Sequence, residues 1–131
     1  VDAQCLETLV SMAHSEHQLI RLHAVIALAQ LSVHVDCVLK IIATGTALPL
    51  LMKIALSTPT VSAYLTASMR REAARVIENV ARFKPTQAMA SLQTHALDQF
   101  EAWPKEISEV ADPMIRDRCQ RALRILREGV A

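Results

Sequence analysis

The segment GTALPLLMKIAL, residues 45–56, decides the fold, because it marks a corner between two helices. Gly45 is one of only two glycines in the chain, and it follows the apolar segment 35–43. Glycine often ends a helix, since it adopts the left-handed conformation at little cost. Proline is tolerated in the first turn of a helix, where its missing N–H would have no partner. We therefore predict a short helix over 35–43, a tight corner at Gly45, and a second helix with Pro49 in its first turn.

Apolar residues also recur at helical spacing before this corner, where we predict helices over 3–14 and 18–32. The second segment is apolar on nearly all sides, so we expect it to contact more than one neighbour. His23 lies inside that segment and is expected to be a buried structural histidine. The residues predicted to point inward are Leu6, Leu9, Val10 and Ala13 in the first helix, and Leu19, Leu22, Val25 or Ile26, and Ala29 in the second.

A longer helix is predicted after the corner. Thr58-Pro59 is typical of a helix start, and Lys84-Pro85 is typical of a stop. We therefore expect residues 59–83 to form one helix, and the alternative is a break in the Ser/Thr-rich stretch 57–62. Its predicted buried face consists of Val61, Leu65, Met69, Ala73, Val76, Val80 and Phe83.

The last third of the chain is also expected to be helical. Residues 86–95 and 96–109 are two predicted helices, the second interrupted by Pro104. Asp112-Pro113 combines a cap with a first-turn proline and predicts a final helix over 114–128. The residues of that helix predicted to point inward are Ile115, Cys119, Ala122, Leu123 and Leu126.

The composition supports an all-α fold and excludes several classes of function. The 131 residues suit a single domain, and aromatic residues make up only 3%, so the core must be built from small and aliphatic side chains. A net charge of +1 gives no bulk attraction to nucleic acid, and no apolar run reaches the ~18 residues of a membrane span. Three widely spaced cysteines favour a reducing compartment, which we take to be the cytoplasm, with the nucleus as an alternative. The first residue is Val, so we expect the chain to be an excerpt of a longer protein.

The polar motifs do not predict catalysis. The cluster His14-Ser15-Glu16-His17 lacks a further ligand for a tetrahedral metal site, so we expect a solvated corner there. Cys119 occupies a position that Ala24 and Ala73 take elsewhere, which indicates packing rather than a nucleophile. Phosphate-binding loops and zinc-protease motifs are absent from the sequence. We therefore expect no catalytic residues, no metal site and no cofactor.

The chain repeats itself. When the sequence is aligned with itself at a single offset, HAVIALAQLS at 23–32 matches EAARVIENVA at 72–81. At the same offset, TALPLL at 46–51 matches HALDQF at 95–100. The corner Gly45-Thr46-Ala47-Leu48-Pro49-Leu50-Leu51, with Glu72-Ala73-Ala74 and Asn79-Val80-Ala81 in the long helix, resembles the armadillo repeat. That family combines a short first helix, a glycine corner, a second helix and a long third helix.

The resemblance implies an all-α, right-handed armadillo-like superhelix of about two and a half repeats. Residues 3–32 would be a partial repeat, 35–83 a complete repeat with an extended third helix, and 86–128 a degenerate repeat. In the last repeat, Thr94 and Asp98 replace the corner glycine and the proline. A HEAT-repeat array is the nearest alternative, but it lacks the separate short helix before the corner.

The resemblance also implies a binding groove, because the third helices of armadillo arrays line a concave surface. The groove residues that it indicates are Ile26, Gln30, Arg71, Arg75, Asn79, Arg82, Arg118 and Arg121. Asn79 takes the position of the asparagine with which the family clamps peptides, whereas Ile26 and Arg75 replace the tryptophan. A groove lined by arginine favours an acidic or phosphorylated segment. The alternative is a solvated face whose arginines pair with Glu72 and Glu78.

These observations lead to a hypothesis about function. We expect a non-catalytic scaffold that binds a peptide or helix of another protein along the third-helix groove. The alternative is a regulatory ligand-sensing or autoinhibitory module of a larger enzyme, in which the arginines hold a small anion. Because short solenoids expose the apolar ends of their stack, we also expect flanking repeats or self-association.

Overall fold

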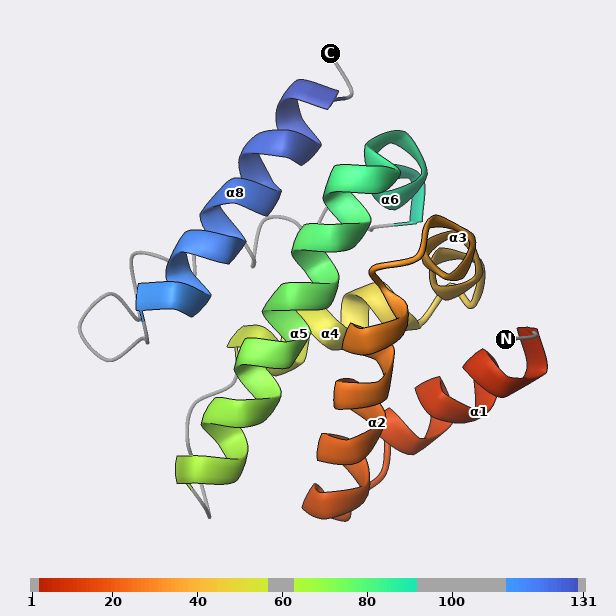
Figure 1. Ribbon diagram of the computed structural model, residues 1–131, viewed down its shortest axis with the longest axis vertical. Coiled ribbons are helices and arrows are strands. Elements are labelled where there is room, and N and C mark those ends of the chain that lie inside the picture. Colours follow the sequence, from red (N-terminus) through yellow and green to blue (C-terminus); the bar gives the residue numbers. More distant parts are fainter. Residues whose placement is uncertain (1–2, 57–62, 92–112, 130–131) are drawn as a thin grey trace.

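The computed structural model describes residues 3–56, 63–91 and 113–129 of the chain, and all the elements in them are helices (Figure 1). Their bounds are Ala3–Ala13 (α1), Gln18–Leu31 (α2), Val35–Ala43 (α3), Ala47–Leu56 (α4), Ala63–Phe83 (α5), Pro85–Ser91 (α6) and Pro113–Gly129 (α8). The described part of the chain is therefore all-α, as the low aromatic content and the helical spacing predicted. The expected helix over 96–109, the cap at Thr58 and the alternative break at 57–62 lie outside the described residues.

The predicted corner between α3 and α4 is confirmed. Gly45 has a φ of +76°, in the left-handed region, and its N–H donates to the carbonyl of Ile42 at 3.1 Å. The chain turns by 96° between the two helices. The first backbone hydrogen bond of α4 runs from the N–H of Leu50 to the carbonyl of Thr46 at 3.2 Å, one residue after Pro49. The missing N–H of Pro49 therefore leaves no gap in the helix.

Substitution of Gly45 is expected to destabilise the chain through backbone strain alone. A Cβ added at Gly45 meets nothing within 4 Å, so there is space for a side chain. A left-handed conformation nevertheless costs an alanine about 1 kcal/mol. We expect Gly45→Ala to lower the free energy of unfolding by about that amount in urea denaturation. Gly45→Asn should lose less, since asparagine tolerates this conformation, and equal losses for both variants would argue against the strain.

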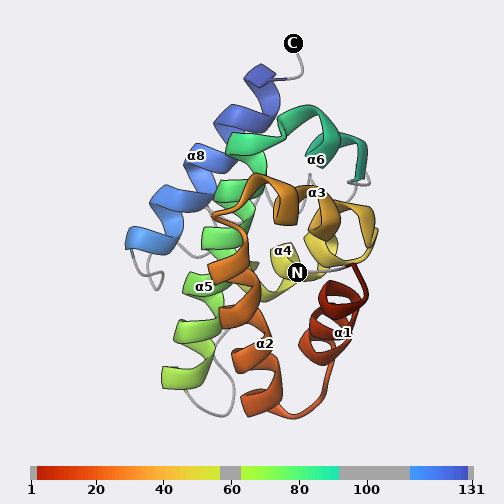
Figure 2. The ribbon, with the colours of Figure 1, turned by 45° about the vertical axis from the view of Figure 1, so that its right-hand side comes forward.

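The longest described helix, α5, lies at the centre of the fold. It packs against α2 on one side and α8 on the other, and the three helices form a row (Figures 1 and 2). Helix α4 packs against α5, and α1 packs against α2, so these two helices form a second layer behind the row. The short helices α3 and α6 contact each other and α5.

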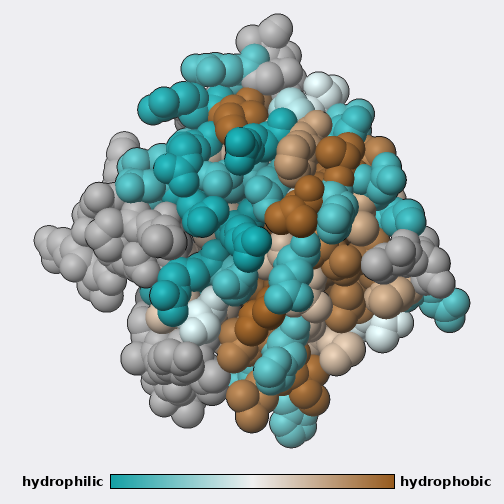
Figure 3. Space-filling view, in the orientation of Figure 1, coloured by the Kyte–Doolittle hydropathy of each residue, from teal (hydrophilic) through white to brown (hydrophobic). Residues whose placement is uncertain are grey.

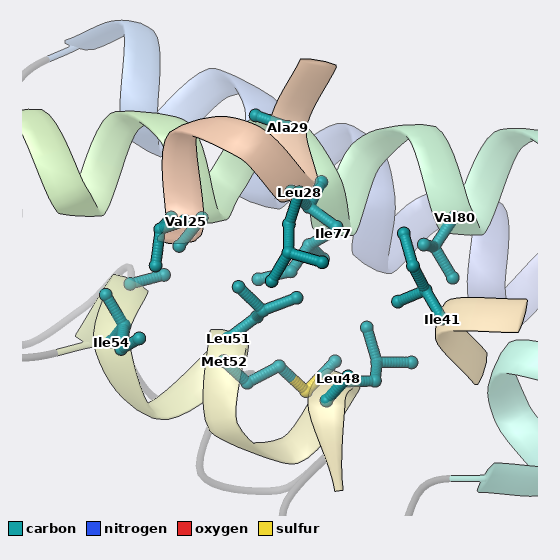
Figure 4. Close-up of a cluster of buried hydrophobic side chains, with 14 of the residues drawn as sticks. Val25, Leu28, Ala29, Ile41, Leu48, Leu51, Met52, Ile54, Ile77 and Val80 are labelled. Atoms are coloured by element: carbon teal, nitrogen blue, oxygen red, sulfur yellow. The ribbon is translucent and has the colours of Figure 1, made fainter. Parts of the chain in front are cut away.

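The core lies between the two layers and contains aliphatic side chains, as the composition predicted. Leu28 of α2, Leu51 of α4 and Ile77 of α5 meet there, each at most 1% exposed (Figure 4). Buried residues of α3 and α4 join the same cluster. No single helix in the described ranges has the length and apolar character of a membrane span; the bent pair α3 and α4 passes that test on length and composition only.

Three burial predictions were wrong, and each error lies where a helix lacks a covering neighbour. Phe83 is 37% exposed at the last residue of α5, and Leu19 is 59% exposed near the start of α2. His23 is also exposed and is not a buried structural histidine. Helix α2 packs against α1 and α5, but these neighbours leave Leu19 and His23 exposed. In α8, burial is confirmed for Cys119, Ala122 and Leu126.

Candidate functional site

The outer face of α5 carries the arginines that the sequence singled out. Arg71, Arg75 and Arg82 are four and seven residues apart, which places them on one side of the helix. Val76 and Val80 lie on the opposite side and are fully buried. Arg71 and Arg82 are exposed, and the side chain of Arg75 is 38% exposed. The three guanidinium groups therefore belong to the solvent side of the row of helices.

Asn79 was expected to share this exposed face, but it lies at the contact between α5 and α2. The residue is 8% exposed, and its Nδ2 donates to the Oγ of Ser32 at 2.9 Å. The Ser32 hydroxyl in turn donates to the carbonyl of Ala29 at 2.7 Å. The Asn79 amide thus joins two neighbouring helices, and this donor is already engaged.

Arg118 and Arg121 of α8 also have a structural partner. Arg118 Nη1 lies 3.1 Å from Glu78 Oε1, and Arg121 Nε lies 2.6 Å from Glu78 Oε2. The side chain of Glu78 is only 8% exposed, so the carboxylate of this pairing is shielded from water. Arg118 and Arg121 therefore hold α8 against α5. The side chain of Arg121 is 54% exposed, so it remains accessible beside the arginines of α5.

The counter-charges on α5 are unevenly distributed. Arg75 Nη1 lies 3.7 Å from Glu72 Oε2 in a partly exposed pair, and such pairs contribute little. Glu78, expected as the second partner of this face, pairs with the arginines of α8 instead. Within the described residues, Arg71 and Arg82 form no ion pair. The outer face of α5 consequently keeps an excess of positive charge.

The groove residues expected on α2 lie beside this basic face. Gln30 is exposed, and Ile26 is partly buried against the core. Figure 3 shows hydrophilic side chains over α5 and α8, and a more hydrophobic surface over α2. The structure thus brings the predicted residues of three helices to one side of the molecule, where Arg71, Arg75, Arg82 and Gln30 are the accessible ones.

Arg70 has a role that the sequence analysis missed. It is 3% exposed, and its Nε donates to the carbonyl of Ala55, close to the end of α4, at 3.3 Å. Cations are favourable near helix C-termini, so Arg70 joins α5 to α4. Its spacing from Ala73, Ala74 and Ile77, all buried, was the signal in the sequence that it belongs to the inner side.

Cys119 does not have the environment of a nucleophile. Burial raises the pKa of the Cys119 thiol to about 12; the nearby Arg70 lowers it and Glu78 raises it, but both act less than desolvation. The thiol is therefore protonated at neutral pH, whereas catalysis by cysteine requires the thiolate.

The thiols of Cys5 and Cys119 are accordingly expected to differ in reactivity. Iodoacetamide at pH 8 should alkylate the exposed Cys5 and leave the buried Cys119 unmodified in the native chain, with mass spectrometry as the readout. In urea both thiols should react. Rapid native alkylation of Cys119 would contradict the buried, protonated state.

A polar hollow of about 270 Å³ lies where α1 approaches the α3–α4 corner. Its lining consists of Glu7, Val10, Ser11, His14, Ala43, Thr44 and Thr46. His14 Nδ1 donates to the carbonyl of Val10 at 2.9 Å, which fixes the ring against its own helix. The described residues contain no group of three or more His, Cys, Asp or Glu placed to hold a metal ion. No arginine lines this hollow.

Comparison with known proteins adds no family to this description. No protein-family model matches the sequence, and no curated protein matches it. The function consequently has to be inferred from the residues and geometry above.

Proposed function

We propose that this chain is a non-catalytic protein-interaction module, which binds an acidic or phosphorylated segment of another protein across the outer face of α2, α5 and α8. One observation carries the proposal: Arg71, Arg75 and Arg82 share the solvent side of the central helix, with Glu72 as their only ion-pair partner in the described residues. Guanidinium groups bind carboxylates and phosphates through two parallel hydrogen bonds.

We further propose that the helices belong to an armadillo-like solenoid, a right-handed superhelix of about two and a half repeats. The order of a short helix, a glycine corner, a second helix and a long third helix supports this assignment over α3, α4 and α5. Helices α1 and α2 correspond to the last two helices of a preceding repeat. The row of α2, α5 and α8 would then be the third-helix surface on which such arrays bind their partners.

The residues of the predicted groove would have different roles in binding. Asn79 and Arg118 hold neighbouring helices together, so they would support the surface from within. Arg71, Arg75 and Arg82 would supply the charge. A charge-assisted hydrogen bond contributes about 1.5–3 kcal/mol, so three such contacts would contribute about 4.5–9 kcal/mol, which corresponds to millimolar to micromolar affinity.

The test uses peptides of 16 residues selected from a random library on the immobilised chain. We expect the enriched peptides to be rich in Asp and Glu, and Arg75→Glu to weaken their binding at least tenfold, since it removes an attraction and adds a repulsion. The thermal midpoint should barely change, because the site is at the surface. Lys53→Glu is the matched control: it makes the same charge change at an exposed position of α4, in the other layer.

Two results would contradict the proposal. The first is enrichment of neutral or basic peptides. The second is equal weakening by Arg75→Glu and Lys53→Glu, which would indicate a general charge effect rather than a site on α5.

A further inference from the structure

The outer face contains a line of apolar residues on α2 beside the line of arginines on α5. Leu19, Ile26 and Val33 follow one another at intervals of seven residues along α2 and the turn after it. Leu19 is 59% exposed and Val33 is 46% exposed, while Ile26 is partly buried. Ser32, at the end of α2, keeps right-handed helical angles (φ −69°, ψ −7°), so Val33 nearly continues the helical line. Residues seven apart in a helix lie on almost the same side.

The two lines run alongside each other. Helices α2 and α5 point in the same direction in the row, and the bond between Asn79 and Ser32 fixes their relative position (Figure 1). Arg75 lies about one turn before Asn79, and Arg82 lies about one turn after it. The arginines therefore flank the upper part of the apolar line. In Figure 3 hydrophobic and hydrophilic side chains lie side by side over α2, next to the hydrophilic surface of α5 and α8.

The details of this surface favour a helical occupant over an extended one. The Nδ2 donor of Asn79 is engaged by Ser32, and Asn79 is 8% exposed, so Gln30 is the one side-chain amide among the predicted groove residues that could hold the backbone of an extended segment. An apolar line that repeats every seven residues, about 10 Å along the axis, matches the stripe of an amphipathic helix laid beside it. Charge complementarity requires acidic residues on the flank of that helix that faces α5.

We therefore propose that the outer face binds an amphipathic acidic helix of the partner, with its apolar stripe along Leu19, Ile26 and Val33 and its acidic flank over Arg71, Arg75 and Arg82. This inference rests on the proposed function and adds the conformation and the apolar content of the bound segment. The partner helix would cover apolar side chains of α2, Leu19 above all, that stay exposed although α2 packs against α1 and α5.

The experiment uses the tightest-binding peptide from the random-library selection. We expect its sequence to carry apolar residues at helical spacing with Asp or Glu along one flank. The ¹³Cα shifts of the labelled peptide should become helical when it binds. The double variant Leu19→Ser/Val33→Ser should weaken binding at least tenfold. Leu39→Ser, which removes a similarly exposed apolar side chain from α3, should leave the affinity unchanged.

The outcomes separate this inference from the proposed function. A bound peptide with extended shifts, or one unaffected by Leu19→Ser/Val33→Ser, overturns the helical proposal, while the proposed function survives if Arg75→Glu still weakens that peptide tenfold. Loss of binding in Leu39→Ser equal to that in the double variant also overturns it. Failure to enrich any acidic peptide overturns both.

Discussion

Replacing Leu51 by alanine is expected to lower the free energy of unfolding by about 3 kcal/mol, the largest loss that we predict for a single substitution. Leu51 is fully buried, and its side chain meets Leu28 of α2 and Ile77 of α5 between the two layers (Figure 4). Truncation removes apolar burial and leaves a cavity that three helices would have to close together. Urea denaturation of the variant should give this loss with an unchanged dependence on denaturant.

Lys53→Ala provides the control for Leu51→Ala, since it is an exposed position two residues further along the same helix. We expect it to change the free energy of unfolding by less than about 0.5 kcal/mol. A loss below about 1 kcal/mol for Leu51→Ala would contradict the placement of Leu51 in the core between the two layers.

Glu78→Gln is expected to lower the free energy of unfolding by about 2 kcal/mol, because it removes the charge that holds two arginines of α8. The substitution keeps the shape of the side chain, so the loss reports the pairing rather than a cavity. The Glu78 carboxylate is shielded from water, but the side chains of its partners Arg118 and Arg121 are 28% and 54% exposed. Because the arginines are partly solvated, the expected loss is smaller than that for a fully buried ion pair.

Glu72→Gln is the matched control for this second prediction. It makes the same chemical change on the same helix, but its pair with Arg75 is partly exposed and 3.7 Å long. We expect a loss below about 0.5 kcal/mol. Similar losses for Glu72→Gln and Glu78→Gln would show that the contact between α5 and α8 does not depend on the buried carboxylate.

The features of the fold that depend on local sequence were predictable. Gly45 and Pro49 located the corner because a left-handed residue and a first-turn proline have few other uses in a helical chain. Lys84-Pro85 located the end of α5, because Pro85 is the first residue of the next helix, α6. Apolar periodicity identified the buried side of α5 from Met69 to Val80, since those residues all face one layer.

The partners of polar side chains could not be predicted, because they come from distant parts of the chain. Asn79 pairs with Ser32, and Glu78 pairs with arginines of α8, across separations that no local pattern encodes. The sequence identified Arg118 and Arg121 as surface residues but not as the pair that holds α8. For α2, the sequence pattern is apolar on nearly all sides, and only the neighbouring helices decide that Leu19 stays exposed.

The central claim is that the solvent side of α2, α5 and α8 is a binding surface for an acidic segment. Chemical-shift mapping of the ¹⁵N-labelled chain, titrated with the tightest peptide from the library selection, tests it most directly. The account predicts that the largest shifts fall on Arg71, Arg75 and Arg82 of α5 and Gln30 of α2. Shifts concentrated instead at the hollow beside His14, with the arginines of α5 unaffected, would contradict the account.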